Sequence, residues 1–180
     1  MAKVPSALPV APPRVEALAD IHLLKVFSND ELLELMHAGE TIKTESHSNI
    51  VIEGELSWGL FLILSGNVLI SKTNKLTGDS YDVAQLGKGN FFGEMSLVDE
   101  NPRSATVKAL SDCELFSISK VAFYNFLNKS PDRKVRFFES CTRSLVMRLR
   151  DLGDDYVISQ YQLWKVALKR DPLSKESEAA

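Results

Sequence analysis

The sequence predicts a mainly β protein in which an antiparallel jelly roll is flanked by helices. Between Thr41 and Ser119 the chain consists of short runs rich in Val, Ile, Leu and Phe, separated by glycine or by Asn, Asp and Ser. Such runs are typical of strands. No helical stretch of a dozen residues divides them, although the crossovers of a parallel sheet would require one. Apolar residues recur with a helical period before and after this region, so we expect helices at both ends of the roll.

The length and composition fit one globular domain with short extensions. A chain of 180 residues, with 44% apolar and 25% charged residues, can hide roughly 70% of its unfolded surface. Its 21 basic and 24 acidic residues leave a net charge of −3, which disfavours a protein that coats nucleic acid. No apolar run reaches the length of about 18 residues that spans a bilayer, and the N-terminus lacks the apolar core of a secretory signal. We therefore expect a cytoplasmic protein without membrane insertion.

The N-terminal region predicts a disordered leader followed by two short helices. Four prolines fall within residues 1–14, so we expect this leader to be extended and to lie outside the fold. Apolar residues in the range 15–40 recur with a broadly helical period. Ser28 and Glu31 have the spacing of a capping box, which predicts that the second helix begins there.

The roll itself is predicted over residues 41–119. Its strand runs end at glycines or at short polar turns, and they number seven or eight, as in sandwiches and rolls. The clearest runs are 50–52, 60–64, 68–71, 81–86, 105–109 and 114–118.

Two C-terminal helices are predicted over residues 120–152, divided at the Ser130-Pro131 pair. Apolar residues of the second helix recur at alternating spacings of three and four. This a/d stripe comprises Val135, Phe138, Thr142, Leu145, Leu149 and Leu152. The stripe predicts either packing onto the roll or a homodimer through residues 135–152, and we favour the dimer.

The helix that carries this stripe is expected to stop at Gly153, because glycine disfavours a helix. Residues 153–180 then predict a further amphipathic segment and a solvated tail. Tyr161 and Trp164 in this segment are expected to pack or to contact a partner rather than to bind a cofactor.

Cysteine and histidine spacing indicates neither a metal site nor a catalytic nucleophile. Cys113 and Cys141 form no CxxC motif, which predicts reduced thiols without a structural zinc. His22, His37 and His47 lie on separate segments without the paired spacing of metal-binding jelly rolls. No Ser or Cys lies in a nucleophile elbow, so we expect no enzymatic activity.

Residues 91–107 interrupt the strand pattern and contain the residues that predict a ligand-binding site. Gly93 permits a close backbone approach, and the residues after it can form a single helical turn whose free N–H groups attract an anion. Arg103 supplies a planar donor fork suited to phosphate, and Ser104 adds a hydroxyl. Glu94 can only accept hydrogen bonds when ionised, so it suits a sugar hydroxyl. This combination predicts a sugar phosphate ligand, although a buried Glu94–Arg103 ion pair that only joins two strands is the alternative.

The same stretch resembles the phosphate-binding cassette of the cyclic nucleotide-binding domain family. The usual form of that cassette is F-G-E, a hydrophobic residue, a small residue and L, followed by P-R-[S/A/T]-A-T-V, and residues 91–107 match every fixed position. The turns at 53–55 and 63–66 also resemble those of the family, so the similarity covers about residues 21–151. The resemblance implies a cyclic nucleotide-binding β-roll in a domain of residues 15–152.

The resemblance also implies roles for individual residues. Glu94 would bind the ribose 2′-hydroxyl, Arg103 the exocyclic phosphate oxygens and Ser104 one phosphate oxygen. The backbone amides of Met95 and Ser96 would complete the phosphate cradle, beside Gly93.

Contacts with the base are implied at four positions. Met95 and Leu86 would form an apolar wall. In the family the long helix after the roll serves as a lid, and Ser144 and Arg148 match the positions that offer a residue to the base. These two residues lie one turn apart on one helix face. Arg148 can stack on a purine, but a merely solvated helical arginine is the alternative.

The implied function is a regulatory protein that binds cAMP or cGMP and signals to an unknown effector protein by movement of the C-terminal helix. We favour cAMP, because guanine-preferring members of the family more often have threonine at the position of Ser104. Relatives that act on DNA add a helix-turn-helix, and the segment after Asp151 shows no such helix pair, so we do not expect DNA binding. The alternative is an interaction scaffold on the same fold that no longer responds to nucleotide.

Overall fold

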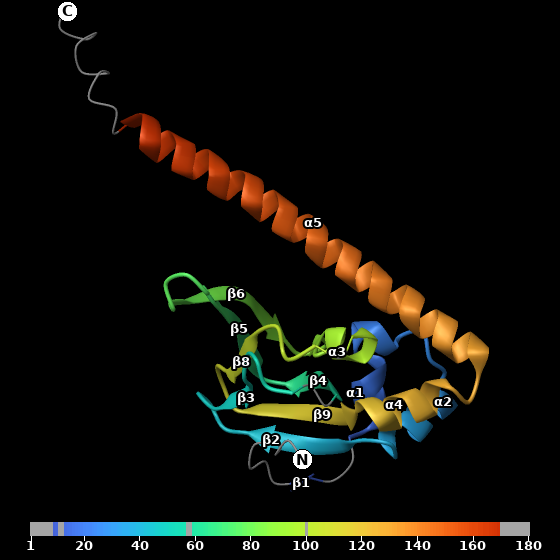
Figure 1. Ribbon diagram of the computed structural model, residues 1–180. Coiled ribbons are helices and arrows are strands. Elements are labelled where there is room, and N and C mark those ends of the chain that lie inside the picture. The colour runs from blue at the N-terminus through green and yellow to red at the C-terminus, as the bar shows by residue number, and fades with distance from the viewer. Residues whose placement is uncertain (1–8, 11–12, 57–58, 100, 170–180) are drawn as a thin grey trace, which may run out of the picture. The chain divides into compact units, whose positions relative to one another are not determined.

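The structure is a computed structural model in which two units are distinguished. The described residues are 9–10, 13–56, 59–99 and 101–169. The first unit spans residues 1–141 and holds both sheets, and the second spans residues 142–180 and holds the remainder of the long C-terminal helix (Figure 1).

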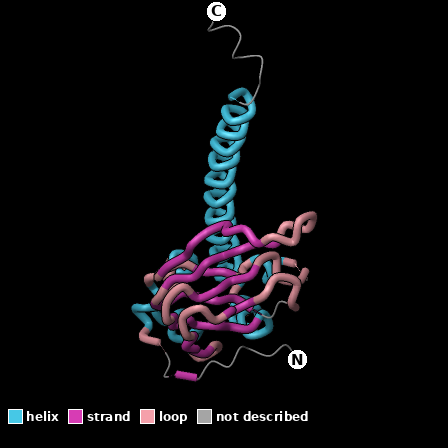
Figure 2. The backbone as a smooth tube through the Cα atoms, turned by 90° about the vertical axis from the view of Figure 1, so that its left-hand side faces the viewer, coloured by secondary structure: helices cyan, strands magenta, loops and turns pink. Residues whose placement is uncertain are grey.

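The first unit contains two antiparallel sheets. Figure 2 shows their strands in magenta. The strands in the described residues are β1 (Pro9–Val10), β2 (Glu40–Thr44), β3 (Asn49–Val51), β4 (Gly59–Ser65), β5 (Asn67–Thr73), β6 (Ser80–Gly87), β7 (Phe91–Phe92), β8 (Thr106–Ala109) and β9 (Cys113–Ser119). One sheet has the order β1-β2-β9-β4-β7, and the other has the order β3-β8-β5-β6. Every pair of neighbouring strands is antiparallel, so the predicted antiparallel β core is confirmed.

Helices precede, interrupt and follow the strands. They are α1 (Val15–Ala19), the 3-10 helix η1 (His22–Leu24), α2 (Asn29–Met36), α3 (Met95–Val98), α4 (Lys120–Leu127) and α5 (Pro131–Lys169). The predicted capping box at Ser28 is confirmed, because Glu31 N donates to Ser28 Oγ and Ser28 N donates to Glu31 Oε2. Among the described residues, no helix combines the length and the apolar character needed to cross a membrane.

The N-terminal leader differs from its prediction. Pro9–Val10 forms β1 and pairs with β2 at the edge of the first sheet, and Pro13 is buried. An edge strand tolerates proline because the missing N–H group can face away from the neighbouring strand. The expectation that this leader lies outside the fold is therefore wrong at these residues, while 1–8 and 11–12 lie outside the described part of the chain.

Strands β4 and β9 lie in the middle of the first sheet and contribute to two hydrophobic cores. Leu60 and Leu62 of β4 pack with the buried side chains of the flanking helices. Phe61 and Ile63 alternate with them and pack inside the roll with Val107 of the second sheet. Side chains of a strand point alternately to its two faces, so burial on both faces explains the continuous apolar run of β4.

Helix α5 is longer than the sequence predicts. The expectation that it stops at Gly153 is wrong, because the helix continues to Lys169. Glycine costs a helix about 1 kcal/mol relative to alanine, whereas proline costs about 3 kcal/mol. No proline occurs in the range 132–169, so the helix passes through the glycine.

The face of α5 that packs within the first unit is not centred on the predicted stripe. The buried side chains are Arg133, Phe137 and Cys141, which follow one another at four-residue spacing. Val135 of the stripe is 57% exposed, whereas Phe138 is partly buried against the helical core. The packed face is therefore offset from the stripe, and the predicted homodimer through residues 135–152 stays a prediction.

Ion pairs fix the first turns of α5 to α2. Glu31 Oε1 accepts hydrogen bonds from Arg133 Nε at 3.2 Å and from Arg136 Nη2 at 2.7 Å. Arg133 Nη1 also donates to the Phe126 carbonyl at 2.9 Å, and Arg136 Nη1 donates to the Val26 carbonyl. These hydrogen bonds to backbone carbonyls add to the ion pairs with Glu31. The first turns of α5 are therefore fixed by both side-chain and backbone groups.

Candidate functional site

The turn between β7 and α3 brings the backbone close to the side chain of Arg103. Gly93 has a φ angle of +87°, which a residue with a side chain rarely adopts. A Cβ atom at Gly93 would lie 2.6 Å from Arg103 Nη1 and 2.7 Å from the Gly59 carbonyl oxygen. Both the conformation and the space therefore require glycine at this position.

Arg103 is buried with its charged group directed into this turn. Its side chain donates from Nη2 to the Gly59 carbonyl at 3.0 Å and from Nη1 to Ser96 Oγ at 3.5 Å. The guanidinium carbon lies 5.6 Å from the ring centroid of Phe61. Its Nε is buried and has no hydrogen-bond partner within the described part of the chain.

The backbone of Arg103 is fixed by the turn at residues 53–55. Arg103 N donates to the Glu55 carbonyl at 2.8 Å, and Gly54 N donates to the Arg103 carbonyl at 2.9 Å. Burial lowers the pKa of the Arg103 guanidinium, and the nearby carboxylates of Glu94 and Glu55 oppose that shift. A guanidinium keeps its proton in proteins, so Arg103 stays charged.

Residues of α3 occupy the other side of the turn. Glu94 is 5% exposed and lies immediately before the helix, in a helical conformation. Ser96 is also buried, and its Oγ donates to the Gly93 carbonyl at 2.6 Å. Met95 is 51% exposed, and Ser104 Oγ donates to Met95 Sδ at 3.7 Å.

The structure thus brings the residues of the predicted cassette together. Contacts or electrostatic interactions join Arg103 to Gly93, Glu94 and Ser96, and a contact joins Met95 to Ser104. A buried positive charge beside a glycine turn, with a buried carboxylate nearby, can bind the phosphate and a hydroxyl of one ligand.

The remaining predicted site residues lie elsewhere. Leu86, near the end of β6, packs at the margin of the roll's interior core opposite Val68. Ser144 and Arg148 belong to the second unit, where both are partly buried on α5. Their proposed contacts with a base stay predictions.

Sequence reasoning missed the groups that hold the cassette from outside. The Gly59 carbonyl accepts from Arg103, and the Glu55 carbonyl accepts from its backbone. From α4, Tyr124 Oη donates to the Leu97 carbonyl at 2.6 Å. No residue pattern indicates a backbone acceptor, but a tyrosine within an apolar helix stripe is a signal, because a buried hydroxyl usually has a partner.

No site for a metal ion accompanies this arrangement in the described ranges of the chain. Groups of three or more His, Cys, Asp or Glu side chains that could hold a metal are absent from them.

The fold and the site together define an antiparallel β-roll with a glycine turn packed against a buried arginine. The sequence model of the cyclic nucleotide-binding domain family matches residues 41–130, which is half of the 180-residue chain. The chain belongs to the cyclic nucleotide-binding domain family, and it contains a regulatory domain of that type.

Two curated relatives have names that refer to cyclic AMP. The chain is 38% identical over 82 residues to the cyclic AMP receptor protein of Thermus thermophilus, a match that covers 46% of this chain and 38% of that protein. It is 36% identical over 110 residues to a cAMP-dependent protein kinase regulatory subunit of Candida albicans, covering 61% of this chain and 23% of that subunit. The chain therefore matches well under two thirds of the length of either relative.

Solved structures share the fold over most of the chain. A cyclic nucleotide-binding domain from Methylobacillus flagellatus is 26% identical, with a TM-score of 0.76, and the match covers 85% of this chain and 88% of that one. The catabolite activator protein of Thermus thermophilus is 28% identical, with a TM-score of 0.66, and the match covers 78% of this chain and 63% of that one.

Proposed function

We propose that this chain is a regulatory module that binds a cyclic purine mononucleotide, prefers cAMP to cGMP, and catalyses no reaction. The observation that carries the proposal is the state of Arg103, a buried guanidinium whose Nε has no hydrogen-bond partner among the described residues. A buried donor without an acceptor is unfavourable, and a phosphate oxygen would supply a charge-assisted bond. The names of two relatives, which refer to cyclic AMP, support the choice of cAMP.

The residues of the cassette bind the phosphate and the ribose in this proposal. Arg103 binds the exocyclic phosphate oxygens, together with the backbone amides of Met95 and Ser96. Ser104, which is exposed beside Met95, binds a phosphate oxygen through its hydroxyl. Glu94 accepts a hydrogen bond from the ribose 2′-hydroxyl, because an ionised carboxylate repels phosphate but binds a hydroxyl donor.

The base is bound by Met95 of the cassette and by three residues outside it. Met95 and Leu86 form its apolar wall, and Ser144 and Arg148 contact it from α5. The 51% exposure of Met95 supports this role, because an exposed thioether can cover an aromatic ring without moving the buried core.

Signalling follows from a shift in the population of α5 positions. A ligand that binds better to one arrangement of the cassette favours that arrangement, and with it one position of the helix. The output passes to an effector protein rather than to DNA. A homodimer forms through residues 135–152, a proposal that the exposure of Leu149 (70%) and Leu152 (52%) supports.

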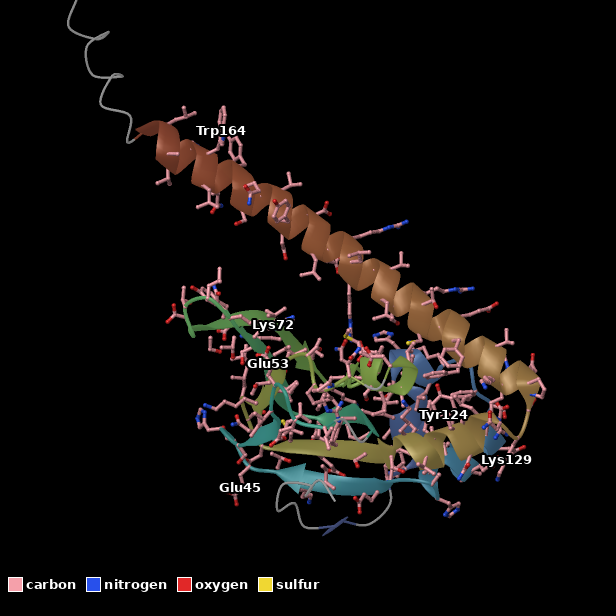
Figure 3. All side chains as sticks on the ribbon, viewed as in Figure 1. Glu45, Glu53, Lys72, Tyr124, Lys129 and Trp164 are labelled. Atoms are coloured by element: carbon pink, nitrogen blue, oxygen red, sulfur yellow. The ribbon has the colours of Figure 1, made fainter. Side chains whose placement is uncertain are left out.

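The second candidate is an interaction scaffold that does not respond to nucleotide. The exposed aromatic side chains near the end of α5 favour it. Tyr161 is 65% exposed and Trp164 is 70% exposed on this helix. Figure 3 labels Trp164 near the end of α5. Exposed aromatic side chains at helical spacing suit a partner surface.

Calorimetric titration of the purified chain with cAMP, cGMP and a cyclic dinucleotide separates the two candidates. The proposal expects saturable binding of cAMP, weaker binding of cGMP and none of the dinucleotide. Tighter binding of cGMP would overturn the preference only. Absence of heat with both mononucleotides, confirmed by unchanged thermal unfolding in their presence, would favour the scaffold.

A further inference from the structure

We propose that Tyr124 of α4 is a positioning residue that couples the cassette to the start of α5. The inference rests on the proposed function, because it concerns how occupancy of the nucleotide site reaches the long helix. It depends on contacts within the first unit alone, where Tyr124 lies between α3 and the first turn of α5 (Figure 3).

The hydroxyl of Tyr124 holds the C-terminal end of α3. Tyr124 Oη donates to the carbonyl of Leu97, a residue that is 1% exposed, at 2.6 Å. Carbonyls in the last turn of a helix lack partners within the helix, and α3 is a single turn. Lys120, one turn earlier on α4, donates from Nζ to the Asp99 carbonyl at 3.2 Å. Two side chains on one face of α4 therefore hold the end of the cassette helix.

The other side of Tyr124 contacts α5. Lys134 Nζ lies 5.7 Å from the centroid of the Tyr124 ring, within the range of a cation–π interaction. The same ammonium group is 3.3 Å from Asn128 Oδ1, at the end of α4. Arg133 extends the connection, because its guanidinium carbon lies 4.4 Å from the centroid of the Phe126 ring.

Through these contacts Tyr124 transmits a movement of α3 to α4 and to the start of α5. Gly93 and Glu94 directly precede α3, and the Tyr124 hydroxyl donates to the Leu97 carbonyl near its C-terminal end. A displacement of this short helix therefore pulls directly on that hydrogen bond. A carbonyl that loses its partner in a buried position is unfavourable, so α3 and α4 move together as long as the bond is present. The first turn of α5 follows α4 through Lys134 and Arg133.

The test compares Tyr124→Phe with the wild-type chain. The substitution removes the hydroxyl and keeps the ring, and Tyr81→Phe on β6 is the matched control because Tyr81 is 54% exposed. For each protein, cAMP affinity is measured by calorimetry. Hydrogen exchange of residues 131–141 is measured with and without saturating cAMP.

We expect Tyr124→Phe to bind cAMP while the cAMP-dependent change in exchange at 131–141 falls at least about twofold, because the two sites have lost coupling free energy. Tyr81→Phe should match the wild type in both measurements. A response of full size in Tyr124→Phe, or no response in a wild type that binds cAMP, would overturn the role of Tyr124 alone. Failure of the wild type to bind would instead overturn the proposed function and the coupling with it.

A second variant keeps the inference testable if Tyr124→Phe does not fold. Lys120→Met removes the neighbouring bond to the Asp99 carbonyl and retains an apolar stem of similar length. It should also reduce the response at 131–141 without abolishing cAMP binding. An undiminished response in this variant contradicts the coupling through α4.

Discussion

Arg103 is a cation enclosed by groups that satisfy only some of its donors. One carbonyl, one hydroxyl and the face of Phe61 surround it, while its Nε has no partner in the described structure. Desolvation of a charge is costly unless hydrogen bonds replace water, so this residue favours an anion that completes its shell. In the proposed function, the nearby carboxylate of Glu94 accounts for a ligand that carries both a phosphate and a hydroxyl.

Substitution of Gly93 tests the geometry of this turn. Gly93→Ala should lower the free energy of unfolding by more than about 1 kcal/mol, because alanine is strained at positive φ and its Cβ would meet Arg103 and the Gly59 carbonyl. The same variant should lose cAMP affinity. Thermal unfolding and calorimetry measure the two effects.

Gly78→Ala is the matched control. Gly78 has a φ of +80° but nothing within 4 Å of its Cβ position, so this variant carries the backbone strain without the clash. It should be destabilised less than Gly93→Ala and should bind cAMP normally. Equal stability and equal affinity of the two variants would show that the close approach to Arg103 has no role.

For single residues, the sequence predicts which side chains within the motif lie close together. It does not predict which groups from other strands contact them. The stretch from Gly93 to Ser104 contains its own glycine, acid and arginine, so their proximity follows from local order. The carbonyl of Gly59 could not be predicted, because it comes near Arg103 only after β4 and β7 pair in register.

Among the elements, α5 is joined to α2 by ion pairs at Glu31. Glu31 completes the capping box of α2 and also accepts hydrogen bonds from Arg133 and Arg136, so one carboxylate joins the start of α2 to the start of α5. Desolvation raises the pKa of Glu31, but hydrogen bonds from Arg136, the Ser28 backbone and Arg133 outweigh it and lower the pKa from 4.5 to about 2.

This shift predicts a dependence of stability on pH. A carboxyl whose pKa is lowered on folding stabilises the fold above its unfolded value near 4.5, and it loses that contribution as the pH falls toward about 2. The contribution is up to about 3 kcal/mol. Denaturant unfolding between these pH values should show a steeper loss of stability in the wild type than in Glu31→Gln.

Glu16→Gln serves as the control, because Glu16 is an exposed residue of α1. Its pH profile should follow that of the wild type. Parallel profiles for Glu31→Gln and the wild type would mean that the network around Glu31 does not stabilise the fold.

For the whole molecule, the exposed apolar side chains along α5 bear on whether two chains pair as a homodimer. Leu149 and Leu152 of the predicted stripe are largely exposed, and so are Tyr156 and Leu163 at the heptad positions that follow. A stripe that continues past Gly153 extends the possible coiled-coil seam to a greater length than the sequence alone predicts.

Replacement of Leu149 tests the homodimer. Leu149→Lys should shift the chain from dimer to monomer in sedimentation experiments, because a charge at a core position of the seam opposes pairing. Met147→Lys is the control, since Met147 is 66% exposed but lies off the stripe. A wild type that sediments as a monomer at all concentrations contradicts the dimer.

The global fold could be predicted because its signals are short-range. Alternating apolar runs, glycine turns and the cassette each occupy a few consecutive residues. The extent of α5 and the pairing of Pro9–Val10 with β2 were missed, because helix propagation and tertiary pairing outweigh the local preferences of glycine and proline.

The most direct measurement is a calorimetric titration of cAMP into Arg103→Ala, alongside the wild type and Arg14→Ala, which changes an exposed arginine. Charge-assisted hydrogen bonds contribute about 1.5–3 kcal/mol, so Arg103→Ala should bind about 10- to 100-fold more weakly, while Arg14→Ala should match the wild type. If a folded Arg103→Ala protein binds cAMP as tightly as the wild type, the phosphate is not bound by Arg103 at this turn.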